Sequence, residues 1–508
     1  MSEMEAPTAP PPGPQLGSRN AVAKNAVHLL LGQISTTALA IVFSAALGRS
    51  LGAKDFGLYF LISAFSTFAY VLVDWGQQFY VIREVARAPA RGGQLLGTTL
   101  ALRAAGAVVL SVPAGLLTWA LGYDARTCWF SIAFMAANLP FVLAQAFGMV
   151  FRGHDQMGLD ASVSVVNKSV SLALAFPALL LGTGLSGVLV SQGVAGMVAF
   201  AVAARLHRRV ATGPVLWSAR TAREVLAGGS AIVVVAIAVS VQPYLDAIIL
   251  SKLVPADVLG WFGAAKNIMG TLLAPAVIIG AAAFPRLSRA ASDVSTFNVE
   301  VQATLRPMLC LGALVGVGTY LFADSAIALV YGRQHFGEAG TILKVFAPGL
   351  FLVFVDVLFG NALTALGRAT AFAVAKVGSV LLSTGLDLVL IPLFQRRTGN
   401  GGIGVVLGFV ASEIVVFAGA ALLMPRGSLK PEVGVDVLRA FASAAITALL
   451  FRWLPPLPMA IGVPMCVLAF ALCALAFGLI RRSDLSLLKA LARPRIAAAA
   501  AASDARAR

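Results

Sequence analysis

The chain has 508 residues, of which 59% are hydrophobic and 12% charged, and its formal net charge is +16. A soluble domain carries roughly a quarter of its residues as Asp, Glu, Lys and Arg, so this composition excludes a soluble globular protein. Four cysteines without a CxxC pair, four scattered histidines and no Walker A sequence favour a protein that is not an enzyme and needs no cofactor or metal.

Apolar stretches follow one another along the whole chain. Each is long enough to cross ~30 Å of hydrocarbon as a helix, and lipid leaves the backbone no alternative to helices in sequences of this kind. Prolines inside several stretches, including Pro243 and Pro275, either kink the helices or are simply tolerated. Hydropathy predicts about fourteen transmembrane helices, at 26–48, 57–79, 99–121, 129–151, 163–182, 185–204, 225–250, 259–284, 307–331, 342–366, 371–394, 402–424, 439–456 and 460–480.

Three segments outside these spans differ in composition. Residues 1–22 are rich in proline and have no apolar core, which predicts a disordered cytoplasmic tail and not a signal peptide. Residues 205–224 contain five arginines and a tryptophan. This composition fits either an interfacial helix that connects two halves of the protein or a solvated basic linker. The tail 481–508 contains a stretch, 484–495, that can form a basic amphipathic helix on the inner leaflet.

Basic residues are concentrated in alternate loops. With the N-terminus inside, the inner loops and tails hold most of the Lys and Arg, as the positive-inside rule requires. The sequence therefore predicts a multi-pass protein of the plasma (bacterial inner) membrane with both termini cytoplasmic. The inner set includes Arg83, Arg87, Arg91, Arg205, Arg208, Arg209, Arg220, Arg223, Arg286, Arg289, Arg481 and Arg482.

Two stretches about 200 residues apart are alike. Residues 47–59 and 250–262 each combine a helix end, a short charged turn, and a glycine and an aromatic residue at the start of the next helix. At a constant offset, Arg49 matches Lys252, Gly57 matches Gly260, and an arginine ends the following apolar stretch in both copies. Such a repeat predicts two pseudo-symmetric halves with a substrate path between them.

Charged residues fall inside several of the predicted spans. A charge at mid-bilayer costs about 2.5–3.5 kcal/mol on insertion scales, so it usually faces a water-filled cavity or a partner. The candidate functional groups of the chain are among these residues: Asp74, Arg103, Lys168, Asp246, Lys266, Asp356, Lys376, Asp387 and Glu413.

Position suggests different roles for them. Arg103 and Lys168 lie near helix starts, where a long side chain can reach the headgroups, whereas Asp356 is too deep and too short to do so, which favours a cavity. Lys376 and Asp387 are eleven residues apart, on nearly the same helix face, and are expected to share one cavity.

The remaining three charges lie on other helices. Asp246 and Lys266, on adjacent helices, form a structural ion pair or contact the substrate. Glu413 is either a buried hydrogen-bonding residue or a cavity group.

Several motifs together resemble a known family. They are residues 51–59 (LGAKDFGLY), 73–76 (VDWG), 246–250 (DAIIL), 260–266 (GWFGAAK), 363–368 (LTALGR), 386–392 (LDLVLIP) and the pair Ser412-Glu413. Their order and spacing resemble those of the Wzx-like polysaccharide and O-antigen flippases of the multidrug/oligosaccharidyl-lipid/polysaccharide exporter superfamily. The chain departs from that pattern at Asp387, where the family usually has Asn, and in residues 395–400 before Gly401.

The resemblance implies an all-α polytopic membrane protein with two six-helix lobes in a V. The lobes would be 23–204 (spans one to six) and 225–424 (spans seven to twelve), joined by 205–224, with two extra helices at 439–480. The implied cargo is a polyprenyl-diphosphate-linked oligosaccharide for surface polysaccharide biosynthesis, such as lipopolysaccharide or exopolysaccharide. A polymerase and glycosyltransferases are the implied partners; nucleic acid is not.

A diphosphate head group needs a wet, cationic cleft. The candidate substrate-binding residues are Lys266, Arg103, Lys168 and Lys376, because Lys and Arg pair well with phosphate oxygens. The candidate ion-coupling or cavity residues are Asp356, Asp387, Asp246 and Asp74, with H⁺ or Na⁺ as the counter-ion. Two alternatives stay open: a cation-coupled antiporter of small drugs from the same superfamily, which would use these acids, and a non-transporting membrane scaffold.

Overall fold

The computed structural model describes residues 19–210, 213–455 and 457–480, and these ranges contain helices but no strand. The expected tails therefore lie outside the described residues, apart from residues 19–22, which belong to the first helix. The main helices are α1 (Arg19–Asp74), α2 (Gln77–Arg87), α3 (Gly92–Ala120), α4 (Ala125–Gly153), α5 (Met157–Leu180), α6 (Gly184–His207), α7 (Ala219–Ser240), α8 (Gln242–Leu253), α9 (Ala256–Leu272), α10 (Ala274–Ala290), α11 (Val294–Tyr331), α12 (Arg333–Phe336), α13 (Ala339–Ala365), α14 (Ala369–Thr398), α15 (Gly402–Leu423), α16 (Pro431–Arg452) and α17 (Met459–Ala476).

Twelve helical segments of the described chain are long and apolar enough to cross a membrane. One of them, Leu31–Arg87, reverses its direction partway, and α7 and α8 are not among the twelve. The expected all-helical, multi-pass membrane fold is confirmed. The count of about fourteen spans is not confirmed and stays a prediction.

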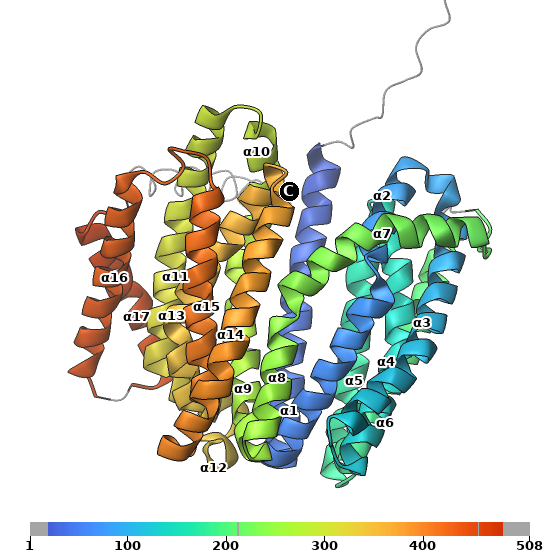
Figure 1. Cartoon of the computed structure of the whole chain (residues 1–508), viewed down its shortest axis with the longest axis horizontal. Coiled ribbons are helices and arrows are strands. Elements are labelled where there is room, and N and C mark those ends of the chain that lie inside the picture. Colours follow the sequence, from blue (N-terminus) through green and yellow to red (C-terminus); the bar gives the residue numbers. More distant parts are fainter. Residues whose placement is uncertain (1–18, 211–212, 456, 481–508) are drawn as a thin grey trace, which may run out of the picture.

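The reversal in α1 occurs at Gly52, whose φ of 71° and ψ of 176° interrupt the helix. A positive φ of this kind is costly for any residue with a Cβ, so glycine is the natural choice here. In Figure 1, α1 descends from one end of the bundle and returns towards α2 from the other. We call the end where α1 begins the N-terminal face and the opposite end the Gly52 face.

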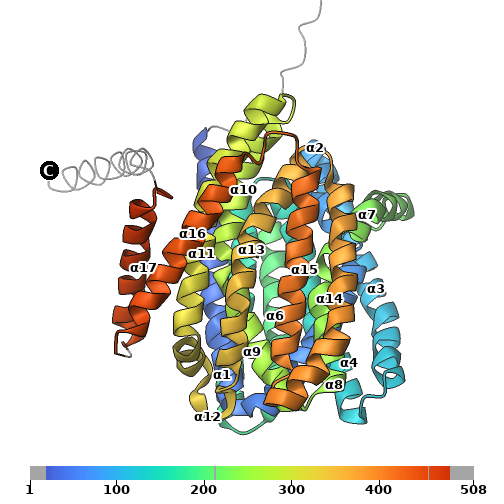
Figure 2. The same ribbon diagram turned by 60° about the vertical axis from the view of Figure 1, so that its left-hand side comes forward.

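The helices gather in two groups. The second half of α1 packs with α3–α6, the blue and cyan side of Figure 1, whereas α9–α15 form the yellow and orange side. We refer to α1–α6 as the N-terminal half and to α8–α15 as the C-terminal half. The pair α16 and α17 lies at the edge of the bundle against α11 (Figure 2), where Arg306 of α11 and Asp436 of α16 form an ion pair of 2.8 Å.

Two expected single spans are broken in the structure. The stretch 225–250 is divided into α7 and α8 at Val241, and 259–284 into α9 and α10 at Leu273. A proline in the first turn of each second helix, Pro243 and Pro275, explains the breaks, because proline is well placed at a helix start and costly inside one.

Neither of the two alternatives for 205–224, an interfacial helix or a solvated linker, describes the whole segment. Helix α6 continues to His207, residues 213–218 are not helical, and α7 begins only at Ala219, where the Ser218 side chain caps it. The linker is therefore short, and the connecting helix is the first part of α7.

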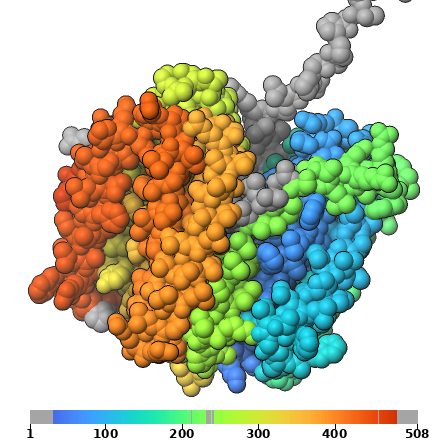
Figure 3. All heavy atoms as spheres, viewed as in Figure 1, coloured from blue at the N-terminus to red at the C-terminus, as the bar shows by residue number. Residues whose placement is uncertain are grey.

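Helix α7 connects the two halves. Its first turns lie on α2 and α3, where Glu224 pairs with Arg91 at 2.9 Å and the Trp75 indole N–H donates to the Leu226 carbonyl at 3.1 Å. The hydrogen bond from Arg91 lowers the pKa of the Glu224 carboxyl below its ordinary value. Further along, α7 and α8 pack against α14. Figure 3 shows this green strip running between the orange and the blue helices.

Candidate substrate cavities and the buried charges beside them

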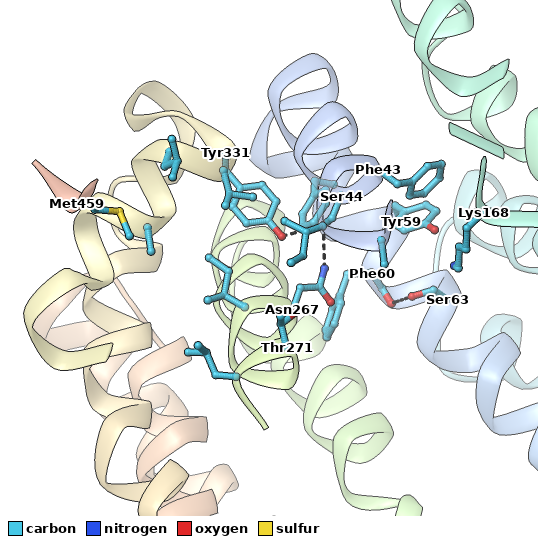
Figure 4. A pocket seen from close by; sticks show the side chains of 18 residues that line it. Phe43, Ser44, Tyr59, Phe60, Ser63, Lys168, Asn267, Thr271, Tyr331 and Met459 are labelled. Carbon is cyan, nitrogen blue, oxygen red and sulfur yellow. Dashed lines mark hydrogen bonds between the residues drawn. The ribbon is translucent and has the colours of Figure 1, made fainter. Parts of the chain in front are cut away.

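A cavity of about 460 Å³ lies between the two halves. Its walls come from α1, α9 and α11 and are mostly apolar, with a small polar group at one side (Figure 4). There the hydroxyls of Ser44 and Tyr331 lie 2.7 Å apart, and the Asn267 amide donates to Ser44 at 3.1 Å. Because Met459 of α17 also lines it, this space extends towards the edge of the bundle, and we call it the lateral cavity.

A second cavity, of about 510 Å³, lies inside the N-terminal half. It is lined by helices α1 to α6, and amide and hydroxyl side chains make up much of its wall. We call it the polar cavity. These uncharged polar groups are Tyr59, Ser63, Thr67, Tyr70, Gln78, Asn138, Gln145 and Gln192.

Lys168 of α5 lines both cavities, together with Tyr59 and Ser63 of α1. Figure 4 shows the three side chains close together. In the described part of the chain, Lys168 makes no hydrogen bond and no ion pair, unlike the other three predicted cations. The Lys168 ammonium group is thus the basic group available to an anionic ligand where the two cavities meet.

Arg103 does not reach the headgroups, one of the two roles considered for it. Its side chain is buried, with the residue only 2% exposed, and it forms an ion pair with Asp74 while donating to the Val142 carbonyl at 2.7 Å. Both members of the pair line the polar cavity. Arg103 is nevertheless already neutralised by its partner, which leaves less of its charge for a ligand.

Lys376 is also neutralised, by two acids. Its ammonium group lies 2.8 Å from Asp356 and 3.3 Å from Glu413, so three helices of the C-terminal half meet at this lysine. Glu413 is therefore a buried hydrogen-bonding residue. Neither Lys376 nor Asp356 lines the lateral or the polar cavity.

Lys376 and Asp387 were expected to share one cavity, but neither of them lines the lateral or the polar cavity. Asp387 is fully buried, and its electrostatic neighbours are Asp246 and Lys266, not Lys376. Both residues lie on one buried face of α14, as expected. Different neighbouring helices pack against that face at the two positions.

Lys266 and Asp246 form an ion pair of 3.7 Å, one of the two roles considered for them. The Lys266 ammonium group also lies 5.3–5.8 Å from the ring centroids of Phe262, Phe346 and Phe409, within cation–π range. Lys266 lines neither the lateral nor the polar cavity. This enclosure makes it an internal residue of the C-terminal half in this conformation.

The buried charges of the C-terminal half do not balance. Asp246, Asp356, Asp387 and Glu413 face two lysines, and each of these acids has at least one buried oxygen without a hydrogen-bond partner in the described chain. For Asp387 both oxygens lack one. Buried carboxylates of this kind are costly when they are ionised and unpaired.

The polar lining of the second cavity was not anticipated. A sequence signal for it exists: Asn138, Gln145 and Gln192 interrupt otherwise apolar spans, where uncharged amides also need partners. The candidate residues predicted from sequence were all charged and did not include these three.

The two halves are joined at the Gly52 face by contacts that cross in both directions. Arg49 of α1 donates to the carbonyls of Leu329 and Val330 at the end of α11, at 2.5 and 2.9 Å. In the other direction, Lys252 of α8 lies 3.3 Å from the ring centroid of Tyr123, next to the end of α3. Arg49 and Lys252 occupy matching positions of the repeat, so the closure has approximate two-fold symmetry.

Comparison with known sequences supports a common origin with glycan-export proteins. A family model described as "Polysaccharide biosynthesis protein" matches residues 22–291. A probable low-salt glycan biosynthesis flippase of Haloferax volcanii is 23% identical over 73% of this chain and 78% of its own length. A putative O-antigen transporter of Shigella flexneri is 23% identical over 68% of this chain and 86% of its own.

Solved structures share the fold at low sequence identity. The lipid II flippase MurJ in an inward closed conformation superposes with a TM-score of 0.70 and 12% identity, covering 90% of this chain and 99% of that one. An inward-facing multidrug resistance transporter of the MATE family gives a TM-score of 0.63 and 15% identity, covering 78% of this chain and 97% of that one. At these identities, the likeness concerns the fold.

Proposed function

The chain belongs to the polysaccharide biosynthesis protein family, and from that premise we propose that it is a flippase for polyprenyl-diphosphate-linked oligosaccharide. Its two named relatives are a glycan biosynthesis flippase and an O-antigen transporter, which supports cargo of the same class. The cargo would cross the membrane by alternating access, through rocking of an N-lobe (23–204) against a C-lobe (225–424).

The observation that carries this proposal is the meeting of two unlike cavities at Lys168. The polar cavity offers amides and hydroxyls to the sugars, and the mostly apolar lateral cavity offers a surface to the lipid tail. Lys168 lies at the junction, where the diphosphate joins sugar to lipid. An ammonium group without an acid partner suits phosphate oxygens there. We therefore place the head group at Lys168 and assign Arg103, Lys266 and Lys376 to internal ion pairs in this conformation.

We place the protein in the bacterial inner membrane with the N-terminal face and both termini in the cytoplasm. The arginines of α2, of α7 and of the end of α10 lie at that face, in agreement with the positive-inside rule. The Gly52 face is then external, and the crossed contacts of Arg49 and Lys252 close the path to the outside. Glycosyltransferases on the inside and a polymerase on the outside would supply and consume the cargo.

We propose a proton as the counter-ion. Three of the four carboxylates of the C-terminal half pair with two lysines, and Asp387 pairs with neither lysine in the described chain. Protonation of one or two carboxylates would relieve the excess negative charge of this set.

An antiporter of small cationic drugs fits the cavities less well. Such a substrate needs an accessible carboxylate, whereas Asp74, the acid that lines the polar cavity, is already paired with Arg103. The basic group available in both cavities is a lysine, which repels cations.

Reconstituted vesicles test the function directly. Purified protein is placed in liposomes with a fluorescent polyprenyl-diphosphate oligosaccharide, and a membrane-impermeant reagent that destroys outer-leaflet fluorophore reports the transfer. We expect inner-leaflet cargo to become accessible faster than in protein-free liposomes, and a phospholipid with the same fluorophore to remain unaffected. Equal rates with and without protein, or equal transfer of both lipids, would refute the proposal.

A further inference from the structure

A third hollow, of about 430 Å³, opens at the Gly52 face, and we call it the outer pocket. It is separate in its lining from the lateral and polar cavities. One wall is Ala53 of α1, next to the Gly52 turn, and the rest comes from Trp261 of α9, from α12 and from the end of α14. Its volume falls within the roughly 300–1,000 Å³ typical of small-molecule sites.

Several side chains of the outer pocket have free hydrogen-bonding groups. In the described chain, the side chains of Asp257, Gln334 and His335 make no hydrogen bond and no ion pair. Gln395 uses its carbonyl oxygen to accept from the Gly401 N–H at 2.9 Å, which leaves its amide N–H₂ group unused. The pocket thus offers donors and acceptors of several kinds within one small space.

Trp261 supplies an aromatic surface beside these groups. Its indole N–H donates to the His335 carbonyl at 2.8 Å, so the orientation of the ring is fixed by α12. A fixed aromatic ring beside convergent amides and a carboxylate suits a ligand with both C–H faces and many hydroxyls.

The charge of the pocket excludes a diphosphate as the ligand. None of the described residues that line it is Lys or Arg, and Asp257 adds a carboxylate. We propose that the outer pocket binds a neutral saccharide, namely the glycan portion of the cargo after it has reached the Gly52 face. The identification of the saccharide as the glycan of the cargo rests on the proposed function. The chemistry of the pocket by itself indicates only a neutral sugar.

Binding there has a consequence for the transport cycle. The pocket is complete only while α1 of one half lies against α9 and α12 of the other, so a bound sugar stabilises the closed Gly52 face. Free product outside would then slow the reopening of the path.

Saturation-transfer difference NMR on the full-length protein in lipid nanodiscs tests the site. The probes are neutral malto- and cello-oligosaccharides of two to four hexose units, with oligogalacturonate as the acidic comparison. We expect saturable binding of a neutral probe, weaker binding of the acidic one, and a loss of roughly tenfold in affinity in Asp257→Ala/Gln334→Ala, whose side chains are exposed and structurally unpaired.

The controls separate this site from the transport path. Trp453→Leu alters a tryptophan of the same face that is 87% exposed and lines none of the three spaces described, so it should bind the probe as the native protein does, whereas Trp261→Leu should not. Lys168→Ala should lose transport and keep probe binding. The proposed saccharide site would be overturned if no probe bound saturably or if the double variant kept the native affinity. If the protein still transported cargo with either result, the proposed function would stand.

Discussion

Gly57 and Gly260, which occupy matching positions of the internal repeat, pack backbone against backbone where the two halves meet. A Cβ added at Gly57 would lie 2.5 Å from the Ala256 carbonyl oxygen and 2.8 Å from the Gly260 nitrogen, and one added at Gly260 would clash with the Ala53 carbonyl. No side chain separates α1 from α9 at this point. The two glycines therefore set how closely the Gly52 face can shut.

Gly260→Leu is expected to hold the two halves apart. The leucine side chain would meet the backbone of α1 at Ala53, which cannot move aside as a flexible side chain can. The closed state should therefore be destabilised by about 1–3 kcal/mol. We expect cysteine pairs across the Gly52 face to cross-link less readily and transport to fall. Gly270→Leu is the matched control, since Gly270 lies on the same helix with no atom within 4 Å of an added Cβ. Equal effects of the two substitutions would contradict this role for the glycine pair.

The internal repeat shows from sequence that Gly57 and Gly260 occupy equivalent positions. It does not show that the two glycines are in contact. Periodicity shows which residues share a helix face, and it placed Lys376 and Asp387 correctly on one buried face. It does not show which helix covers that face at each level. Lys376 consequently pairs with Asp356 and Glu413, whereas the charged neighbours of Asp387 are Asp246 and Lys266.

Ion pairs within a hairpin were more predictable than pairs between distant helices. Asp246 and Lys266 lie on helices joined by a short turn, so their pairing could be proposed from sequence separation alone. The Arg103–Asp74 pair depends on how α3 packs against α1, which no local pattern reveals. For the same reason the polar cavity, built from six helices, could not be assembled from sequence.

Lys168→Ala should weaken binding of the head group. Loss of a charge-assisted hydrogen bond to phosphate costs about 1.5–3 kcal/mol, or roughly 10- to 150-fold in affinity. Flotation of vesicles or native mass spectrometry with a short-chain polyprenyl-diphosphate sugar measures this. Lys168→Arg should bind nearly as the native protein does, and Lys54→Ala, at an exposed position of the Gly52 face, serves as the control. Native affinity in Lys168→Ala would move the diphosphate site elsewhere.

Asp74→Ala should destabilise the N-terminal half, because it leaves the Arg103 guanidinium buried without its partner. Removing one member of a buried pair costs about 3–5 kcal/mol. The thermal unfolding midpoint in detergent should fall accordingly, and Asp74→Leu combined with Arg103→Met should recover most of the loss. Asp55→Ala breaks the more exposed pair with Arg126 and should cost only about 0–1 kcal/mol. If Asp74→Ala were no worse than Asp55→Ala, the buried pair would not support the fold.

Single cysteines test the membrane orientation. In a background without the native cysteines, Arg426→Cys, within 425–436, lies at the N-terminal face, and Glu338→Cys, within 332–340, lies at the Gly52 face; both positions are exposed. An impermeant thiol reagent added to intact cells should label the second and not the first. After the cells are opened, both should react. The reverse pattern would invert the assignment and, with it, the direction of transport.

Asp356→Asn tests the proposed coupling to protons. The native carboxylate lies 2.8 Å from Lys376, which keeps Glu413 as a second partner at 3.3 Å, so the substitution removes one proton-accepting group while the lysine remains paired. Transport in vesicles should slow and become insensitive to a protonophore. Asp387→Asn should be milder, since Asn is the usual residue there in the family that the sequence resembles. Asp324→Asn, in the more exposed pair with Lys344, is the control and should keep the native rate and its gradient dependence. If Asp356→Asn also kept both, the carboxylate would serve only to hold α13 against α14, and the proton site would lie at another carboxylate of the set or would not exist.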